Sequence, residues 1–217
     1  MFITRLIPEH NFINYATLHL LEEWLFLLRV NIYCAKILKN RIGGVFVRIL
    51  GIDPGIATVG FGVVDSEKGK LNYVSCGIIS TPAKTALSSR LDLIYNDLNQ
   101  LFETFKPDVV CIEELFFNTN ITTGIAVAHG RGVILLAAYK AGIPIYEYTP
   151  LQVKQAVVGY GRADKRQVID MVKRILNMKN PPKPDDAADA VALAICHARS
   201  ATSLLSQNAR FDPCSTT

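Results

Sequence analysis

Charged residues and cysteines are both scarce in this sequence of 217 residues. Charged side chains make up 19% of it and hydrophobic ones 50%, and the formal net charge is +4. This balance excludes a disordered chain, which would be poor in hydrophobic residues and high in net charge. No cysteines form a CxxC pair, and their odd number excludes a disulfide framework and a zinc ribbon. The five are Cys34, Cys76, Cys111, Cys196 and Cys214.

A long uncharged hydrophobic run is also missing. The most apolar region, residues 12–38, is interrupted by Glu22, Glu23, Arg29 and Lys36. A membrane-spanning helix needs about 20 nearly uncharged residues, so we expect no membrane contact. An acidic residue precedes the apolar run and no clean cleavage site follows it, which argues against a signal peptide. We therefore expect a cytoplasmic protein.

The character of the chain changes near Val47. Residues 1–46 carry no motif and end in a basic, glycine-containing stretch that is typical of a linker. We expect them to be an N-terminal extension outside the catalytic fold, followed by one domain at residues 47–200 and a flexible tail at residues 201–217. One interpretation of the extension is read-through upstream of a natural start near Val47. The alternative is an amphipathic helix around residues 18–28 that docks on a partner.

From Val47 onward, the spacing of hydrophobic residues predicts strands and helices in a mixed order. The expected strands cover residues 47–52, 58–64, 71–79, 109–112 and 143–148, with a turn at 65–70. The expected helices cover residues 87–105, 119–140, 164–177 and 186–198, and another begins at Thr149-Pro150. Three strands followed by alternating helices and strands predict an α/β fold, a mixed sheet with helices on both faces.

Carboxylates stand at the ends of three of these elements. Asp53 ends the first strand, and Glu113 and Glu114 end the strand at 109–112. Only one of the two glutamates can share a site with Asp53, because neighbouring side chains of a strand point to opposite faces. Asp186 and Asp189 are three residues apart at a helix start and share one face, whereas we expect the adjacent Asp185 to point elsewhere.

Taken one at a time, each of these acids is most simply explained as a cap or a solvated turn residue. Several carboxylates that converge without cations repel one another, so such clusters normally coordinate a hard metal ion. Two Mg²⁺ ions held in this way can activate a water and stabilise the leaving oxygen of a phosphodiester. The carboxylates therefore favour a metal-dependent phosphodiester hydrolase.

The segment between Pro150 and Pro184 is rich in basic residues. Only Asp164 and Asp170 oppose its positive charges, which are Lys154, Arg162, Lys165, Arg166, Lys173, Arg174, Lys179 and Lys183. Beside an acidic metal site, this excess predicts a track for a phosphate backbone, with Arg162 as one of its contacts. The alternative is an ordinary solvated helix face.

Four segments together resemble, in order and spacing, the motifs of the RuvC Holliday-junction resolvases. They are Ile52–Gly55 (IDPG), Ile112–Phe116 (IEELF), Val153–Gly159 (VKQAVVG) and Asp186–Ala190 (DAADA). The first motif alone is weak, since sugar kinases and actin-like ATPases also place an Asp-Gly turn after a first strand. The set of four is specific, and the resemblance covers about residues 48–198.

The resemblance implies an RNase H-like fold and a homodimeric nuclease. Such an enzyme holds two Mg²⁺ ions, with Mn²⁺ as a substitute, and cuts four-way DNA junctions with paired symmetric nicks. Carried onto this sequence, the ligands and catalytic residues are Asp53, Glu113 rather than Glu114, Asp186 and Asp189. The resemblance also implies partnership with the RuvA and RuvB branch-migration proteins, and a role in recombination and repair.

Further residues acquire roles from the same resemblance. Phe116 matches an aromatic residue that stacks on unpaired bases, and Lys154 and Lys165 match contacts to the DNA backbone. The alternative is that Phe116 or Phe117 only packs against the protein. A dimer contact is implied for the helix at 119–140, where Gly124, Ala128 and Gly132 recur at four-residue steps. Packing against the sheet would select the same small residues, so both explanations stay open.

Other functions remain as alternatives at this point. One is an RNase H-like nuclease that acts on RNA or on replication intermediates. A second is a DNA-binding module that has lost catalysis, and a third is an actin-like ATP-dependent kinase, although a second glycine-rich phosphate loop is missing from the sequence. His197 could handle protons, but a histidine two helical turns beyond Asp189 is better explained as structural.

Overall fold

The fold was analysed in a computed structural model, which describes residues 27–28, 46–114 and 121–208. It contains a five-stranded sheet in the order β3-β2-β1-β4-β5. The strands are β1 (Phe46–Asp53), β2 (Thr58–Glu67), β3 (Lys70–Ser80), β4 (Val109–Glu113) and β5 (Ile145–Tyr148). The helices are α2 (Leu87–Phe105), α3 (Ile121–Lys140), α4 (Pro150–Val158), α5 (Lys165–Ile175) and α6 (Asp185–Asn208).

The sheet is mixed, as the order of elements predicted. β1 and β2 pair antiparallel, as do β2 and β3, whereas β1, β4 and β5 run parallel to one another. The turn between β2 and β3 is shorter than the predicted six residues, because both strands continue to Glu67 and Lys70. Lys68 and Gly69 form this turn with φ values of 50° and 78°, and positive values at both central residues are typical of a tight hairpin turn.

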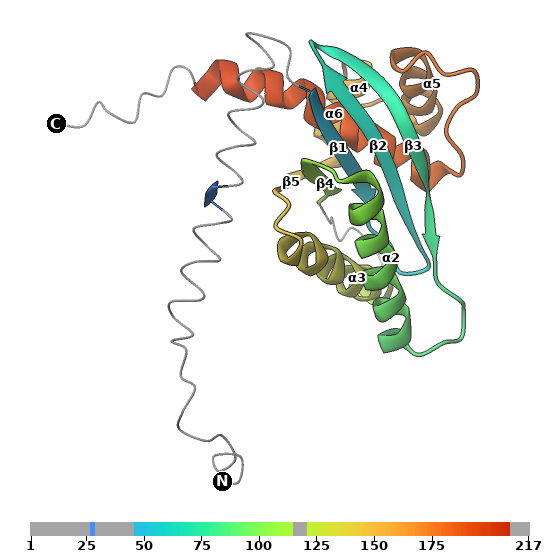
Figure 1. Cartoon of the computed structure of the whole chain (residues 1–217). Coiled ribbons are helices and arrows are strands. Elements are labelled where there is room, and N and C mark those ends of the chain that lie inside the picture. Colours follow the sequence, from blue (N-terminus) through green and yellow to red (C-terminus); the bar gives the residue numbers. More distant parts are fainter. Residues whose placement is uncertain (1–26, 29–45, 115–120, 209–217) are drawn as a thin grey trace, which may run out of the picture.

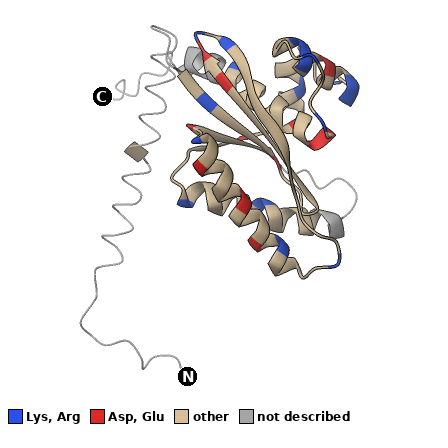
Figure 2. Cartoon of the chain, turned by 45° about the vertical axis from the view of Figure 1, so that its right-hand side comes forward, with Lys and Arg blue, Asp and Glu red and all other residues tan. Residues whose placement is uncertain are grey.

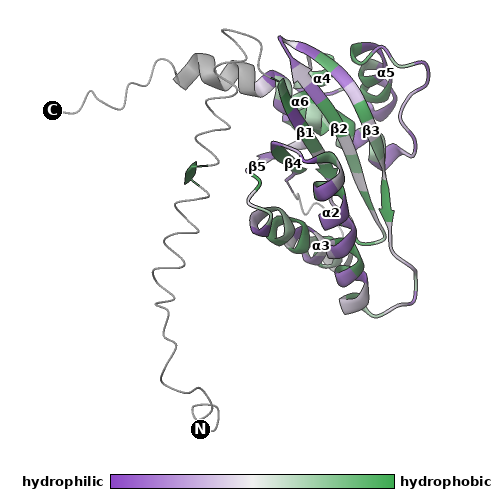
Figure 3. Cartoon of the chain, viewed as in Figure 1, coloured by the Kyte–Doolittle hydropathy of each residue, from purple (hydrophilic) through white to green (hydrophobic). Residues whose placement is uncertain are grey.

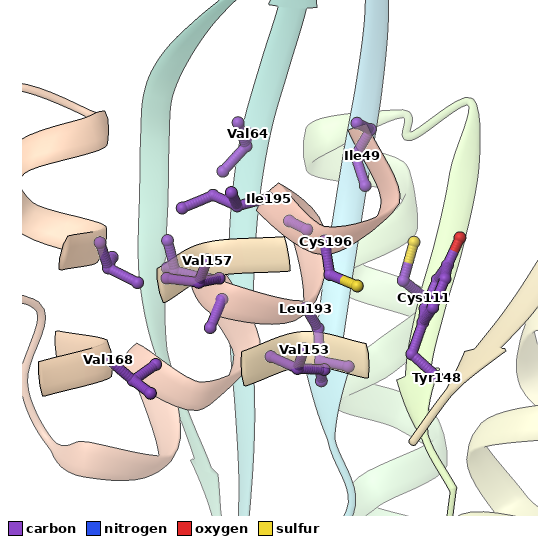
Figure 4. Packing of buried hydrophobic residues seen from close by; sticks show 14 of the residues in the cluster. Ile49, Val64, Cys111, Tyr148, Val153, Val157, Val168, Leu193, Ile195 and Cys196 are labelled. Carbon is purple, nitrogen blue, oxygen red and sulfur yellow. The ribbon is translucent and has the colours of Figure 1, made fainter. Parts of the chain in front are cut away.

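Helices cover both faces of the sheet, which confirms the predicted architecture (Figure 1). On one face, α2 and α3 bury residues such as Ile94 and Ile134 against Leu50 and Ile52 of β1. On the other face, α4, α5 and α6 form a second core with residues of β1 and β4, and Figure 4 shows this packing around Leu193. Alternate side chains of each central strand therefore enter different cores.

Two short helices begin at reciprocal caps that the sequence encodes. The hydroxyl of Thr149 accepts from the backbone N–H of Gln152, whose side chain accepts from the backbone of Thr149 in return. Asp164 and Gln167 form the same arrangement at the start of α5. These caps hold the first turns of α4 and α5, which carry the basic residues expected to contact DNA.

The last helix is longer than the sequence pattern indicated. The hydrophobic period predicted an end at Ala198, but α6 continues to Asn208. The polar composition after Arg199 was a poor guide, because a helix already started can extend through residues of modest propensity at little cost. Within the described residues, no helix combines the length and the hydrophobicity needed to cross a bilayer.

Candidate active site

Asp53 and Glu113 lie side by side at the ends of neighbouring parallel strands. Ile52 of β1 pairs with Ile112 of β4, so the next residues along the two strands are Asp53 and Glu113. Both are in phase with residues of the core beneath α6, Ile49 and Cys111 among them. Their side chains therefore share the α6 face, and the phase of Glu114 is the opposite one.

Three glycines allow α6 to lie directly on the sheet above these acids. A Cβ atom on Gly51 would meet the carbonyl oxygen of Ala190 at 2.0 Å, and one on Gly60 would meet that of Asp186 at 2.1 Å. A Cβ atom on Gly62 would likewise collide with Val191. Backbone-to-backbone approach of this kind needs residues without side chains. The glycines of β1 and β2 thus set where the first turns of α6 stand.

This placement brings three carboxylates together. Asp53, Asp186 and Asp189 each offer an oxygen within 4.8 Å of those of the other two. Glu113 is outside this tight group, but its charge acts on Asp53 and the charge of Asp189 acts on Glu113. The four acids that the resemblance implied as ligands therefore come from β1, β4 and α6 to one end of the sheet.

The electrostatics of the cluster are unfavourable without a cation. Burial, together with the charges of Glu113, Asp189 and Asp186, raises the pKa of Asp53 to about 8. Burial is also the main cause that raises the pKa of Glu113 and of Asp189. Half-buried carboxylates that repel one another and offer only oxygen atoms are a donor set that fits a hard divalent cation.

Among the described residues, Lys165 forms ion pairs with carboxylates at this site. Its Nζ lies 2.9 Å from an oxygen of Asp189 and 3.5 Å from one of Asp185. The expectation that Asp185 points elsewhere was therefore incomplete: Asp185 and Asp189 are one helical turn apart, and the side chain of Lys165 reaches both. This contact opposes the rise in the pKa of Asp189.

The other residues expected to bind DNA occupy different positions. Lys154 is half-buried on α4, and its charge lowers the pKa of Glu113. Arg162 is exposed in the loop between α4 and α5, and basic residues gather on α5 in Figure 2. Phe116 lies outside the described residues, so its predicted stacking role has no structural description.

His197 lies in the core and not at the surface of the site. It is 1% exposed, burial lowers its pKa to about 3, and its Nδ1 is 2.7 Å from the hydroxyl of Tyr148. Its burial agrees with the prediction from the sequence that His197 has a structural role. Tyr148 pairs with Glu113 across β4 and β5, so the contact ties α6 to the strand beside that glutamate.

Sequence reasoning missed the glycines that place α6 and the ion pairs of Lys165. A signal for the glycines was present, since three of them occupy β1 and β2 while small residues recur through the first turns of α6. Glycine is unfavourable inside a strand and often marks close approach of another backbone. No pattern in the sequence could have joined Lys165 to Asp185, because the contact spans two helices.

Comparisons with known proteins identify the relatives of this chain. The family model for the crossover junction endodeoxyribonuclease RuvC matches residues 49–197. The protein of that name from Rubrobacter xylanophilus is 56% identical over 150 residues, which are 69% of this chain and 84% of the relative. The one from Ruminiclostridium cellulolyticum is 58% identical over 152 residues, 70% of this chain and 92% of the relative.

Solved structures give the same result. Thermus thermophilus RuvC in complex with a Holliday junction substrate is 36% identical, with a TM-score of 0.69 over 72% of this chain and 96% of that one. The yeast mitochondrial Holliday junction resolvase is 19% identical with a TM-score of 0.58, covering 74% of this chain and 81% of that one, and supports the RNase H-like fold alone. By its motifs, its fold and these matches, the chain belongs to the RuvC family of crossover junction endodeoxyribonucleases.

Proposed function

We propose that this protein resolves four-way DNA junctions by hydrolysing one phosphodiester in each of two opposed strands. The observation that carries the proposal is the cluster of Asp53, Asp186 and Asp189 at one end of the sheet, with Glu113 beside it. The family membership supplies the substrate, because curated relatives more than 50% identical are crossover junction endodeoxyribonucleases.

Asp53, Glu113, Asp186 and Asp189 are the proposed catalytic residues and metal ligands. Two Mg²⁺ ions, or Mn²⁺ in their place, would lower the pKa of the attacking water and stabilise the leaving oxygen. The protein supplies the negative charge of that site and fixes the positions of its carboxylates. β1 and β4 present two acids from a rigid sheet, and the first turns of α6 supply Asp186 and Asp189.

The DNA backbone is proposed to run along α4 and α5. Lys154 and Lys165 both lie close enough to the carboxylates to influence their charge, and Arg162 lies in the loop between them. A basic surface next to an acidic site lets phosphates approach carboxylates that would otherwise repel them. The stacking role of Phe116 remains part of this proposal on the strength of the family resemblance alone.

A homodimer is the proposed assembly, with α3 at its interface. Gly132 is exposed and a Cβ atom there would meet nothing within 4 Å, so packing inside the subunit does not explain this glycine. Three large exposed residues share its side of α3: Ile125, Leu136 and Tyr139. Figure 3 shows hydrophobic residues along this helix. By contrast, it is Gly130 that packs inside the subunit, against the carbonyl of Gly55.

Two-fold symmetry gives the dimer a functional reason. Two identical sites related by a two-fold axis match a junction of near two-fold symmetry, so paired cuts follow from one geometry. A charge at the centre of the apolar face, as in Leu136→Glu, is expected to yield monomers in sedimentation and to abolish paired cutting. A dimer that persists in this variant would overturn the proposed interface.

The remaining proposals rest on the family. The nuclease domain is proposed to span residues 47–200, in keeping with the match at 49–197, with residues 1–46 as an extension and 201–217 as a tail into which α6 continues as far as Asn208. RuvA and RuvB are the proposed partners in recombination and repair, and a cytoplasmic location is part of the same proposal.

Cleavage of a labelled synthetic four-way junction tests the function directly. The expected result with Mg²⁺ is a pair of symmetric nicks, absent with EDTA and absent on linear duplex. Preference for an RNA–DNA hybrid or a flap would favour a different RNase H-like nuclease instead. If the protein bound the four-way junction tightly but did not cut it with any divalent metal, a DNA-binding module without catalytic activity would be favoured.

A further inference from the structure

The loop between α4 and α5 exposes an aromatic side chain, and the first turn of α4 exposes an aliphatic one. Tyr160 is 47% exposed and Leu151, in the first turn of α4, is 57% exposed. Gly161, which follows Tyr160 in the chain, lies against Leu151, because a Cβ atom on this glycine would come within 2.1 Å of Cδ1 of Leu151. We refer to Leu151, Tyr160 and Gly161 as the Leu151–Tyr160 patch.

The backbone around Tyr160 is held by the end of α4. Gly159 has a φ of 99°, and its N–H donates to the carbonyl of Gln155 at 2.9 Å. This left-handed residue ends the helix and turns the chain outward. Four residues after Tyr160, the cap at Asp164 begins α5. The ring is thus displayed on a short loop that is fixed at both ends.

The residues of the patch alternate along the chain with two lysines whose charges act on the carboxylates. Lys154 is one helical turn after Leu151, so the two share a side of α4, and its charge acts on Glu113. Lys165 follows the loop on its other side and contacts Asp189 at 2.9 Å. The exposed Arg162 is two residues from Tyr160. An apolar surface is therefore embedded in a cationic one, at the edge of the proposed catalytic site.

We propose that the Leu151–Tyr160 patch binds an unstacked base of the junction, with the ring of Tyr160 stacked on its face. The inference rests on the proposed function and adds a base-binding position to it. The positive charges around the patch favour a polyanion as the occupant, whereas exposed apolar side chains contribute nothing to holding phosphates. A nucleic acid offers a flat apolar surface only where a base leaves the stack. A four-way junction provides such bases at its branch point, and an intact duplex does not.

Binding measurements in EDTA separate stacking from charge. We expect Tyr160→Ala to raise the junction Kd about tenfold, because the loss of one base–aromatic stack is typically of that size. Tyr160→Phe keeps the ring and should bind as the wild type does. The slope of affinity against salt should not change in either variant, since neither removes a phosphate contact. Linear duplex should bind the wild type and Tyr160→Ala equally.

A matched control and a direct probe complete the test. Tyr73 is also exposed but lies on β3, so Tyr73→Ala should leave junction binding unchanged. A junction with 5-iododeoxyuridine at the branch point should photocrosslink to Tyr160, and one with the label inside an arm should not. The location of the crosslink is read by mass spectrometry.

The inference is overturned if Tyr160→Ala binds the junction as the wild type does, or if it loses affinity equally for junction and duplex. It is also overturned if Tyr160→Phe is as weak as Tyr160→Ala, because a hydroxyl contact would then replace stacking. The wild-type measurements report separately on the proposed function. A wild-type protein with no preference for junctions would overturn that function, whereas a preference that survives Tyr160→Ala would overturn only the base-binding patch.

Discussion

A methyl group on Gly51 would lie 2.0 Å from the carbonyl oxygen of Ala190. Non-bonded carbon and oxygen atoms do not approach so closely, so α6 crosses β1 at a distance that only glycine permits. Two positions further along β1 is Asp53, and Asp189 directly precedes Ala190. The contact between strand and helix therefore fixes the separation of two carboxylates in the proposed metal site.

Gly51→Ala is predicted to push α6 away from the sheet, because the clash is with backbone atoms that cannot rotate aside. We expect a loss of about 1–3 kcal/mol in the free energy of unfolding. Junction cleavage by the folded protein should also fall, since Asp189 moves relative to Asp53. Urea denaturation and cleavage at matched folded concentration measure the two effects.

The control for this prediction is Gly69→Ala in the hairpin turn, where a Cβ atom meets nothing but φ is 78°. It should cost about 1 kcal/mol through backbone strain and leave cleavage intact. Wild-type cleavage by Gly51→Ala would show that the position of α6 is not critical.

Asp53→Asn is predicted to abolish cutting while junction binding is kept. It should also stabilise the metal-free protein. The folded protein keeps a proton on Asp53 up to about pH 8, whereas an unfolded aspartate loses it near pH 4. Between these values the folded state binds the extra proton, so the stability contributed by this group falls as pH rises from about 4 to about 8.

In Asp53→Asn this loss of stability with rising pH is absent. At pH 8 in EDTA the variant should be more stable than the wild type by on the order of 2 kcal/mol. Urea denaturation at pH 5 and pH 8 measures the difference. Loss of folding and binding together would make Asp53 a structural turn residue and not a ligand.

His197→Asn is predicted to reduce the acid sensitivity of the fold. The pKa of His197 is about 3 in the folded protein and near 6.5 in an unfolded chain. Between about pH 3 and 6.5 the unfolded state therefore binds a proton that the folded state does not bind. The free energy of unfolding falls as pH falls through this window. Urea midpoints at pH 4.5 and 7 should differ less in the variant.

At pH 7 the same variant should lose about 1–3 kcal/mol, because the buried contact with Tyr148 is disturbed. Cleavage by the folded fraction should be kept. If cleavage were lost without loss of stability, His197 would instead act in proton transfer.

Lys154→Ala is predicted to weaken junction binding similarly for many sequences. Removal of one phosphate contact should lower the slope of log affinity against log salt by about 0.9. The exposed Lys70, at the start of β3, is a matched control whose removal should leave the slope unchanged. A loss restricted to one DNA sequence would mean that Lys154 reads a base.

The order of elements and the convergence of acidic residues were both predictable. Hydrophobic spacing located every strand of the catalytic domain, and the start of every helix, within a few residues, because period 2 and period 3.6 reflect which side chains face a core. The choice of Glu113 over Glu114 followed from the family resemblance, and the alternation of strand side chains agrees with it. Errors fell at boundaries, such as the end of α6 and the turn at Lys68 and Gly69.

Residue identity alone was enough to indicate oxygen ligands for a hard cation, a basic track and the family, since charge and donor type are properties of single side chains. The distances between these groups could not be obtained from residue identity. The approach of Gly51 to Ala190 and the reach of Lys165 to Asp185 and Asp189 depend on how three elements pack. So does the raised pKa of Asp53, because burial and the convergence of like charges arise only when strands and helix meet.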